Sequence, residues 1–269
     1  MSPPRQNPAA DARGFTLPAQ PLHYAARVDS RPAPQLKGMN IMTSVEKPVV
    51  IDAADNADAC VIWLHGLGAD GHDFEPVVPE FSDGLRKRVR FIFPHAPHRP
   101  VTINGGMVMR AWYDISEPEL TRQPDEKGIR ASEKILTDLI DEERAGGIDA
   151  GRIVVAGFSQ GGAIALHTGL RYPRKLAGIL ALSTYLPLGD ATEKEAAGAN
   201  HDIPIFMAHG SQDPVIPLSS SEASRAFLTS LGYVIETHTY PMPHSVCGEE
   251  IRDIGDWLSR ILLWPGRPA

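Results

Sequence analysis

Cysteine is scarce in this sequence of 269 residues, which contains only Cys60 and Cys247. Two cysteines are too few for a disulfide scaffold, and this pair lacks the spacing of a zinc site. Cys60 lies within an apolar, strand-like run, and Cys247 lies near the C-terminus. We interpret both as thiols that carry neither a cross-link nor a metal.

Long apolar runs and an excess of basic residues are also missing. No stretch of eighteen or more residues is uninterruptedly apolar, and the N-terminus lacks the apolar middle segment of a secretory signal. The 26 Lys and Arg residues are outnumbered by 33 Asp and Glu, and no basic stretch is interleaved with aromatic residues as a nucleic-acid groove requires. We therefore expect a cytoplasmic protein without integral membrane association and without a nucleic-acid partner.

Proline divides the chain into two parts. Residues 1–41 carry seven of the 24 prolines and no sustained apolar periodicity, which predicts a disordered tail. A start codon assigned too far upstream explains the tail equally well, because Met39 and Met42 lie where the globular pattern begins. The arginines of the tail also allow a transit peptide, although its prolines spoil an amphipathic helix. Residues 42–269 are long enough for one domain with a large core.

Short β-branched runs alternate with longer helical patterns after residue 42. This alternation predicts an α/β fold in which helices cover both faces of a mostly parallel sheet. Helices are predicted over 128–144, 160–172 and 249–263, and strands near 59–65, 90–93, 152–157, 177–183, 203–209 and 233–240.

A Gly-x-Ser-x-Gly motif runs from Gly157 to Gly161, between a predicted strand and a predicted helix. A nucleophilic serine needs a strained turn that exposes its Oγ, and flanking glycines let the strand and the helix pass closely. Elsewhere the same string would be a Gly-rich turn with a surface serine. Its position here predicts Ser159 as the nucleophile, on the elbow that is typical of α/β-hydrolases.

The serine requires two partners, because its hydroxyl is a poor nucleophile until an imidazole oriented by a carboxylate takes its proton. In this fold an acid and then a histidine follow the serine, each on a loop after a later strand. Asp213 and His244 hold these positions. The competing acids Asp190 and Asp202 lie in a polar stretch before the strand. The predicted triad is therefore Ser159, Asp213 and His244.

The oxyanion of an acyl-transfer intermediate requires backbone N–H donors. The predicted donors are the N–H of Gln160, at the start of a helix, and that of Leu67, in the loop after the first long strand. We interpret His65 as a support for this loop. Histidines at 65, 72, 95 and 98 could suggest a metal cluster, but they lie on separate loops without paired-ligand spacing, so neither a metal nor a cofactor is predicted.

Six ordered segments carry a family resemblance: 65–74, 93–97, 102–107 with 109–115, 157–163, 213–217 and 240–244. Together they resemble the carboxylesterase and acyl-protein thioesterase branch of the α/β-hydrolases. The resemblance implies one catalytic domain over 42–269 without a large cap, active on short- to medium-chain esters, and it also implies Leu67 and Gln160 as oxyanion donors. Members are often dimeric, so a homodimer is an expectation, and some act on lipidated proteins.

The stretch 98–124 is too long for an ordinary connection and shows no clear periodicity. We interpret it as a lid that forms part of an acyl pocket, with Met107, Met109 and Trp112 as pocket residues. The alternative is that Trp112 and Tyr113 fill the core.

The sequence thus predicts a serine carboxylesterase that hydrolyses small-molecule esters of short to medium chain length through an acyl-enzyme. An acyl-protein thioesterase or a lysophospholipase would share the catalytic residues and differ in what its surface accepts. A catalytically silent binding module on the same fold is the alternative from another class, and the intact Ser159, Asp213 and His244 argue against it.

Overall fold

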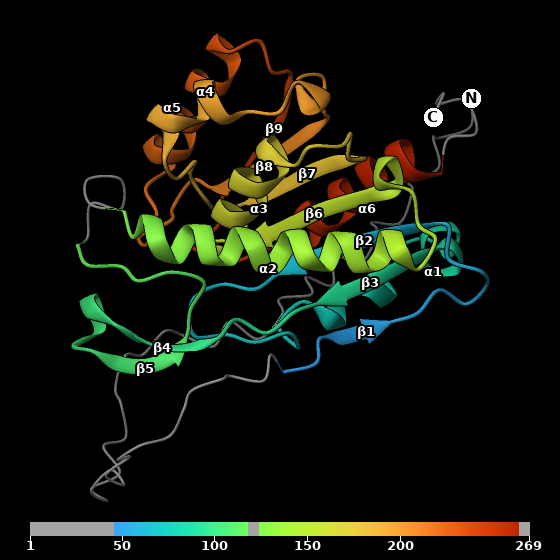
Figure 1. Ribbon diagram of the computed structural model, residues 1–269, viewed down its shortest axis with the longest axis horizontal. Coiled ribbons are helices and arrows are strands. Elements are labelled where there is room, and N and C mark those ends of the chain that lie inside the picture. Colours follow the sequence, from blue (N-terminus) through green and yellow to red (C-terminus); the bar gives the residue numbers. More distant parts are fainter. Residues whose placement is uncertain (1–45, 118–123, 264–269) are drawn as a thin grey trace, which may run out of the picture.

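The computed structural model describes residues 46–117 and 124–263, so the predicted tail over 1–41 lies outside the described residues. A seven-stranded sheet, in the order β1-β3-β2-β6-β7-β8-β9, forms the centre of the molecule (Figure 1). Only β1 runs antiparallel to its neighbour, and the other neighbouring pairs are parallel. The strands are β1 Val49–Ile51, β2 Ala59–Leu64, β3 Val89–Phe93, β6 Ile153–Phe158, β7 Gly178–Leu182, β8 Ile205–Gly210 and β9 Ile235–Tyr240.

Helices cover both faces of the sheet. Figure 1 shows α2 in front of it and α6 behind it. The buried side chains of α1 and α6 belong to one hydrophobic cluster, and those of α2, α3 and α5 belong to the other. The helices are α1 Asp83–Arg88, α2 Glu126–Ala145, α3 Gln160–Arg171, α4 Gly189–Glu195, α5 Leu218–Ser230 and α6 Gly248–Leu262, with 3-10 turns η1 Glu75–Glu80, η2 Thr102–Asn104, η3 Ala150–Arg152 and η4 Gly198–Asn200.

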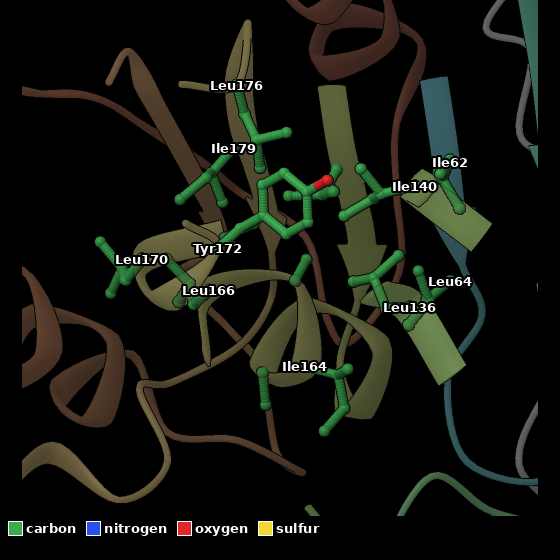
Figure 2. Packing of buried hydrophobic residues seen from close by; sticks show 14 of the residues in the cluster. Ile62, Leu64, Leu136, Ile140, Ile164, Leu166, Leu170, Tyr172, Leu176 and Ile179 are labelled. Carbon is green, nitrogen blue, oxygen red and sulfur yellow. The ribbon is translucent and has the colours of Figure 1, made fainter. Parts of the chain in front are cut away.

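The alternation of side chains along β2 explains why both faces need cover. Ile62 and Leu64 enter the cluster under α2 and α3, whereas Val61 and Trp63 enter the opposite cluster. Figure 2 shows Ile62 and Leu64 beside Leu136 and Ile140 of α2. Each such side chain contributes about 1.5–3 kcal/mol when it leaves water. A strand apolar on both faces is therefore stable only between two helical layers.

All six predicted strands and all three predicted helices are present, with bounds shifted by at most two residues. The short strand β1 was not predicted. The stretch 98–124, predicted as a lid without clear periodicity, contains regular structure in its first half, where His98–Val101 (β4) and Met107–Arg110 (β5) pair as an antiparallel hairpin. This hairpin lacks alternating apolar residues because much of it faces solvent, and residues 118–123 lie outside the described part.

The described residues contain no separate cap domain, as the resemblance implied. The hairpin β4–β5 is instead a small insertion after β3. In the part of the chain that is described, no helix is both long and apolar enough to cross a membrane.

The parallel arrangement determines where a site can form. The carboxyl ends of β6, β8 and β9 all point to the same edge of the sheet. The loops that follow these three strands carry Ser159, Asp213 and His244, so residues that are far apart in the sequence meet at one edge.

Candidate active site

Ser159 lies at a sharp turn between β6 and α3. Its φ of 55° and ψ of −120° place it where few residues other than glycine are found, at a cost of about 1–3 kcal/mol. Two glycines make the turn possible. A Cβ on Gly157 would lie 2.2 Å from the carbonyl carbon of Gly161, and a Cβ on Gly161 would lie 2.4 Å from the carbonyl oxygen of Leu64. The close approach that the motif predicted is therefore present.

The three predicted triad side chains are hydrogen bonded in series. His244 Nε2 lies 2.9 Å from Ser159 Oγ, and His244 Nδ1 lies 2.6 Å from Asp213 Oδ2. With the proton on Nδ1, the imidazole donates to the carboxylate and its Nε2 lone pair accepts the serine hydroxyl. This is the geometry that activates a serine nucleophile.

The carboxylate of Asp213 is buried and has further donors. Its Oδ1 accepts the backbone N–H groups of Val215 at 2.8 Å and of Ile216 at 2.9 Å. Burial alone would raise the pKa of Asp213, but the hydrogen bonds from His209 and His244 outweigh it and hold that pKa well below its ordinary value. The group is therefore an anion at neutral pH.

The competing acids lie elsewhere. Asp202 is exposed and pairs with Lys175 at 2.6 Å. Asp190 is exposed in the first turn of α4. Among the described residues, Asp213 alone has a carboxylate in contact with the imidazole of His244.

The loop that carries Leu67 lies against the serine. A Cβ on Gly66 would lie 3.5 Å from Ser159 Cβ, and the N–H of Gly68 donates to the carbonyl of Arg110 at 2.9 Å. Within the described ranges, no group accepts a hydrogen bond from the N–H of Leu67 or of Gln160. Both N–H groups are thus free for a substrate oxygen, and the Gln160 N–H also lies at the positive end of α3.

His65 supports this loop with both ring nitrogens. Nδ1–H donates to Gly66 O at 2.7 Å, and Nε2 accepts the N–H of Ala96 at 3.0 Å. Burial lowers the pKa of His65 to about 4, so the ring is neutral at neutral pH. His95 likewise accepts the N–H of Gly71 through Nδ1 at 3.0 Å. In the described part of the chain, no three His, Cys, Asp or Glu side chains converge as metal ligands.

The three predicted pocket residues have different surroundings. Met107 is 46% exposed at the hairpin, next to Val108, which is 64% exposed. The sulfur of Met109 lies 3.9 Å from the Cβ position of Gly68, beside the Leu67 loop. Trp112 is fully buried and belongs to the core. The structure therefore favours the alternative that Trp112 fills the core, because its indole ring has no exposed face.

Two residues near the triad were not predicted to belong to the site. His209 Nε2 lies 3.3 Å from Asp213 Oδ2 and donates to Ile216 O at 2.9 Å. The ring of Phe158 packs on the imidazole of His244 with centroids 4.7 Å apart. The signal for His209 was its spacing of four residues before Asp213, at the end of the same strand.

Known proteins resemble this chain in sequence and in fold. Residues 45–262 match the family described as Phospholipase/Carboxylesterase. The chain belongs to this family. Acyl-protein thioesterase 1 of Neurospora crassa, a relative of this phospholipase/carboxylesterase, is 44% identical over 224 residues, which cover 80% of this chain and 91% of that protein. The protein of the same name from Gibberella zeae is 39% identical over 224 residues and is covered to 95%.

Solved structures of similar proteins share the fold. Acyl-protein thioesterase 2 of Zea mays superposes with a TM-score of 0.71 at 26% identity, over 80% of this chain and 99% of that one. SOBER1 of Arabidopsis thaliana superposes with a TM-score of 0.72 at 32% identity, over 76% of this chain and 99% of that one. The predicted α/β-hydrolase fold and the predicted family are confirmed. This member of the phospholipase/carboxylesterase family is a serine hydrolase that acts on carboxylic esters.

Proposed function

We propose that this hydrolase is an acyl-protein thioesterase, which removes fatty acyl groups from cysteine side chains of other proteins. The observation that carries the proposal is the 44% identity to an acyl-protein thioesterase 1 across 91% of that protein's length. Two fungal relatives of the same name are 38–39% identical over similar lengths. The match spans most of each relative's length, which supports the same activity in this chain.

The hairpin β4–β5 offers support of a physical kind. Ile103, Met107 and Val108 are exposed apolar side chains on this hairpin, and exposed apolar groups can contact an apolar ligand. The hairpin continues into Met109, whose sulfur lies beside the Leu67 loop. A long acyl chain bound at Ser159 has apolar surface within reach along this path.

The reaction uses Ser159, His244 and Asp213 in two half-reactions. Ser159 Oγ attacks the thioester carbonyl carbon while its proton moves to His244 Nε2, and the carbonyl oxygen becomes an anion held by the N–H groups of Leu67 and Gln160. Collapse of this intermediate breaks the C–S bond, and His244 gives its proton to the leaving thiolate. Water then attacks the acyl-enzyme in the same way, which releases the fatty acid and restores the serine.

A carboxylesterase acting on short- to medium-chain esters is the second candidate, and the small size of the insertion favours it. The described part of the chain has no cap domain that would enclose a long chain, and the hairpin strands have four residues each. Each methylene that leaves water adds about 0.8 kcal/mol, or roughly fourfold in kcat/KM, until the apolar surface is filled. The two functions therefore differ in the chain length at which this gain stops.

A matched substrate series tests the proposal. Nitrophenyl esters and S-acyl peptides with acyl chains of two to sixteen carbons are assayed with the wild type and with Ser159→Ala as the control. For a thioesterase, kcat/KM rises to sixteen carbons, and a palmitoylated peptide is cleaved faster than any simple ester. A maximum between about two and eight carbons, followed by a fall, would establish the carboxylesterase instead.

A further inference from the structure

We propose that Trp112 is a positioning residue that holds the two oxyanion donors, the N–H groups of Leu67 and Gln160, in register with each other. The inference rests on the proposed use of these donors in the hydrolytic reaction. It concerns a residue that has no contact with solvent, since Trp112 is fully buried.

The indole ring of Trp112 is tied to the loop that carries Leu67. Its Nε1–H donates to the carbonyl oxygen of His65 at 2.9 Å, two residues before Leu67. The rings of Trp112 and His65 also pack together, with centroids 5.3 Å apart. The indole thus holds the main chain at the point where β2 turns into the loop beside Ser159.

The backbone of Trp112 is tied to the second donor residue. Its N–H donates to Gln160 Oε1 at 2.9 Å, and Gln160 Nε2 donates to the carbonyl of Tyr113 at 2.7 Å. The hydroxyl of Ser132 on α2 donates to the carbonyl of Trp112. The amide of Gln160 therefore makes two hydrogen bonds to one dipeptide, and these bonds hold the first residue of α3.

These contacts join two loops beyond the point where the sheet aligns their strands, because β2 and β6 are paired in register only as far as Leu64 and Gly157. The Leu67 loop follows β2, and Gln160 follows β6, so their N–H groups converge on one oxygen only if both loops keep their places. Trp112 contacts both through buried hydrogen bonds, which are strong where water is excluded. A misplacement of about 1 Å at such a site can cost about 100-fold in rate.

Trp63 provides a matched control within the same protein. Trp63 is also buried. It lies on β2, and its ring stacks on Phe74 with centroids 5.0 Å apart. Its Nε1–H has no hydrogen-bond partner among the described residues. Trp63→Phe and Trp112→Phe thus remove similar volumes from the core, but only the second removes a hydrogen bond to the oxyanion loop.

The test compares Trp112→Phe and Trp63→Phe in the full-length chain with a short nitrophenyl ester. For Trp112→Phe we expect kcat to fall about 10- to 100-fold with KM within about twofold of the wild type, because the lost interaction acts on the oxyanion and not on the bound ester. A trifluoromethyl ketone, which adds to Ser159 Oγ and places an oxyanion between the donors, should lose affinity by the same factor. The matching secondary alcohol, which cannot form this adduct, should bind unchanged. Trp63→Phe should change none of these values by more than about twofold.

Equal losses of kcat in the two variants, or equal losses of affinity for the ketone and the alcohol, would show that Trp112 only fills the core and would overturn the inference. If Trp112→Phe does not fold, Ser132→Ala tests the inference instead. This variant removes the hydrogen bond to the Trp112 carbonyl and leaves the indole ring in place. A lower kcat at unchanged KM supports the inference, and an unchanged kcat refutes it. The proposed function is judged separately, from the wild-type substrate series.

Discussion

Replacement of Asp213 by asparagine should inactivate the enzyme by reversing one hydrogen bond. The carboxylate Oδ1 accepts two backbone N–H groups, from Val215 and Ile216, so the oxygen of the new amide must remain on that side. Its NH₂ group then takes the place of Oδ2, which lies 2.6 Å from His244 Nδ1. A donor in this position stabilises the imidazole tautomer with the proton on Nε2. That tautomer cannot accept the proton of Ser159.

The alternative orientation of the amide is no better. With its oxygen toward His244, its NH₂ group would face the backbone N–H groups of Val215 and Ile216, which would then lose their acceptor on this side chain. We therefore expect Asp213→Asn to lower kcat by about 10⁴-fold, or about 5.5 kcal/mol of transition-state stabilisation. The measurement is steady-state hydrolysis of a short nitrophenyl ester, with circular dichroism to verify that the variant is folded.

Asp202→Asn is the matched control, because Asp202 is exposed and its ion pair with Lys175 lies away from the triad. Its activity should stay within about twofold of the wild type, as for surface substitutions in general. A loss of tenfold or less in Asp213→Asn, or a greater loss in Asp202→Asn, would refute the assignment of the acid.

Three further outcomes follow from the structure. Ser159→Ala should lose turnover and labelling by a serine-directed phosphonate at an unchanged melting temperature, because glycines shape the turn; near-normal activity would exclude the serine as nucleophile. Gly161→Ala should lower the free energy of unfolding by about 3 kcal/mol or more, since its Cβ would lie 2.4 Å from Leu64 O, and thermal melting measures this. Burial raises the pKa of Glu250 from 4.5 to about 8. Between these pH values the folded chain therefore binds one proton more than the unfolded chain. The free energy of unfolding should fall as pH rises through this window, by at most about 5 kcal/mol. Glu250→Gln should flatten this profile in urea titrations at pH 5.5 and 8.5, and an unchanged slope would contradict the assignment.

Most of the sheet could be predicted because the strands are buried on both faces. Runs such as 59–64 and 153–157 are almost wholly apolar and end at turns, which is the pattern of a parallel strand between two helical layers. The strand β1 and the hairpin β4–β5 escaped prediction because they are short and partly exposed. Their pairing depends on neighbouring strands and leaves little trace in hydrophobic periodicity.

The site residues likewise differ in whether the sequence alone could predict them. Ser159, Asp213 and His244 could be chosen because each follows a strand that the sequence reveals, in an order that this fold imposes. The contact of His209 with Asp213 and the burial of Trp112 could not be predicted in this way. The sequence shows that an aromatic or imidazole ring is present, but not which residues surround it in the fold.

The sequence by itself determined the α/β architecture, the family and the three residues that meet at the sheet edge, because periodicity and strand-end motifs are local properties. Only the tertiary structure decided what Trp112 does. Its backbone N–H and its indole N–H bind Gln160 and His65, which are 48 and 47 residues away in the sequence. Contacts across such separations arise from the packing of β2, β6 and the segment after β5. No local pattern encodes them.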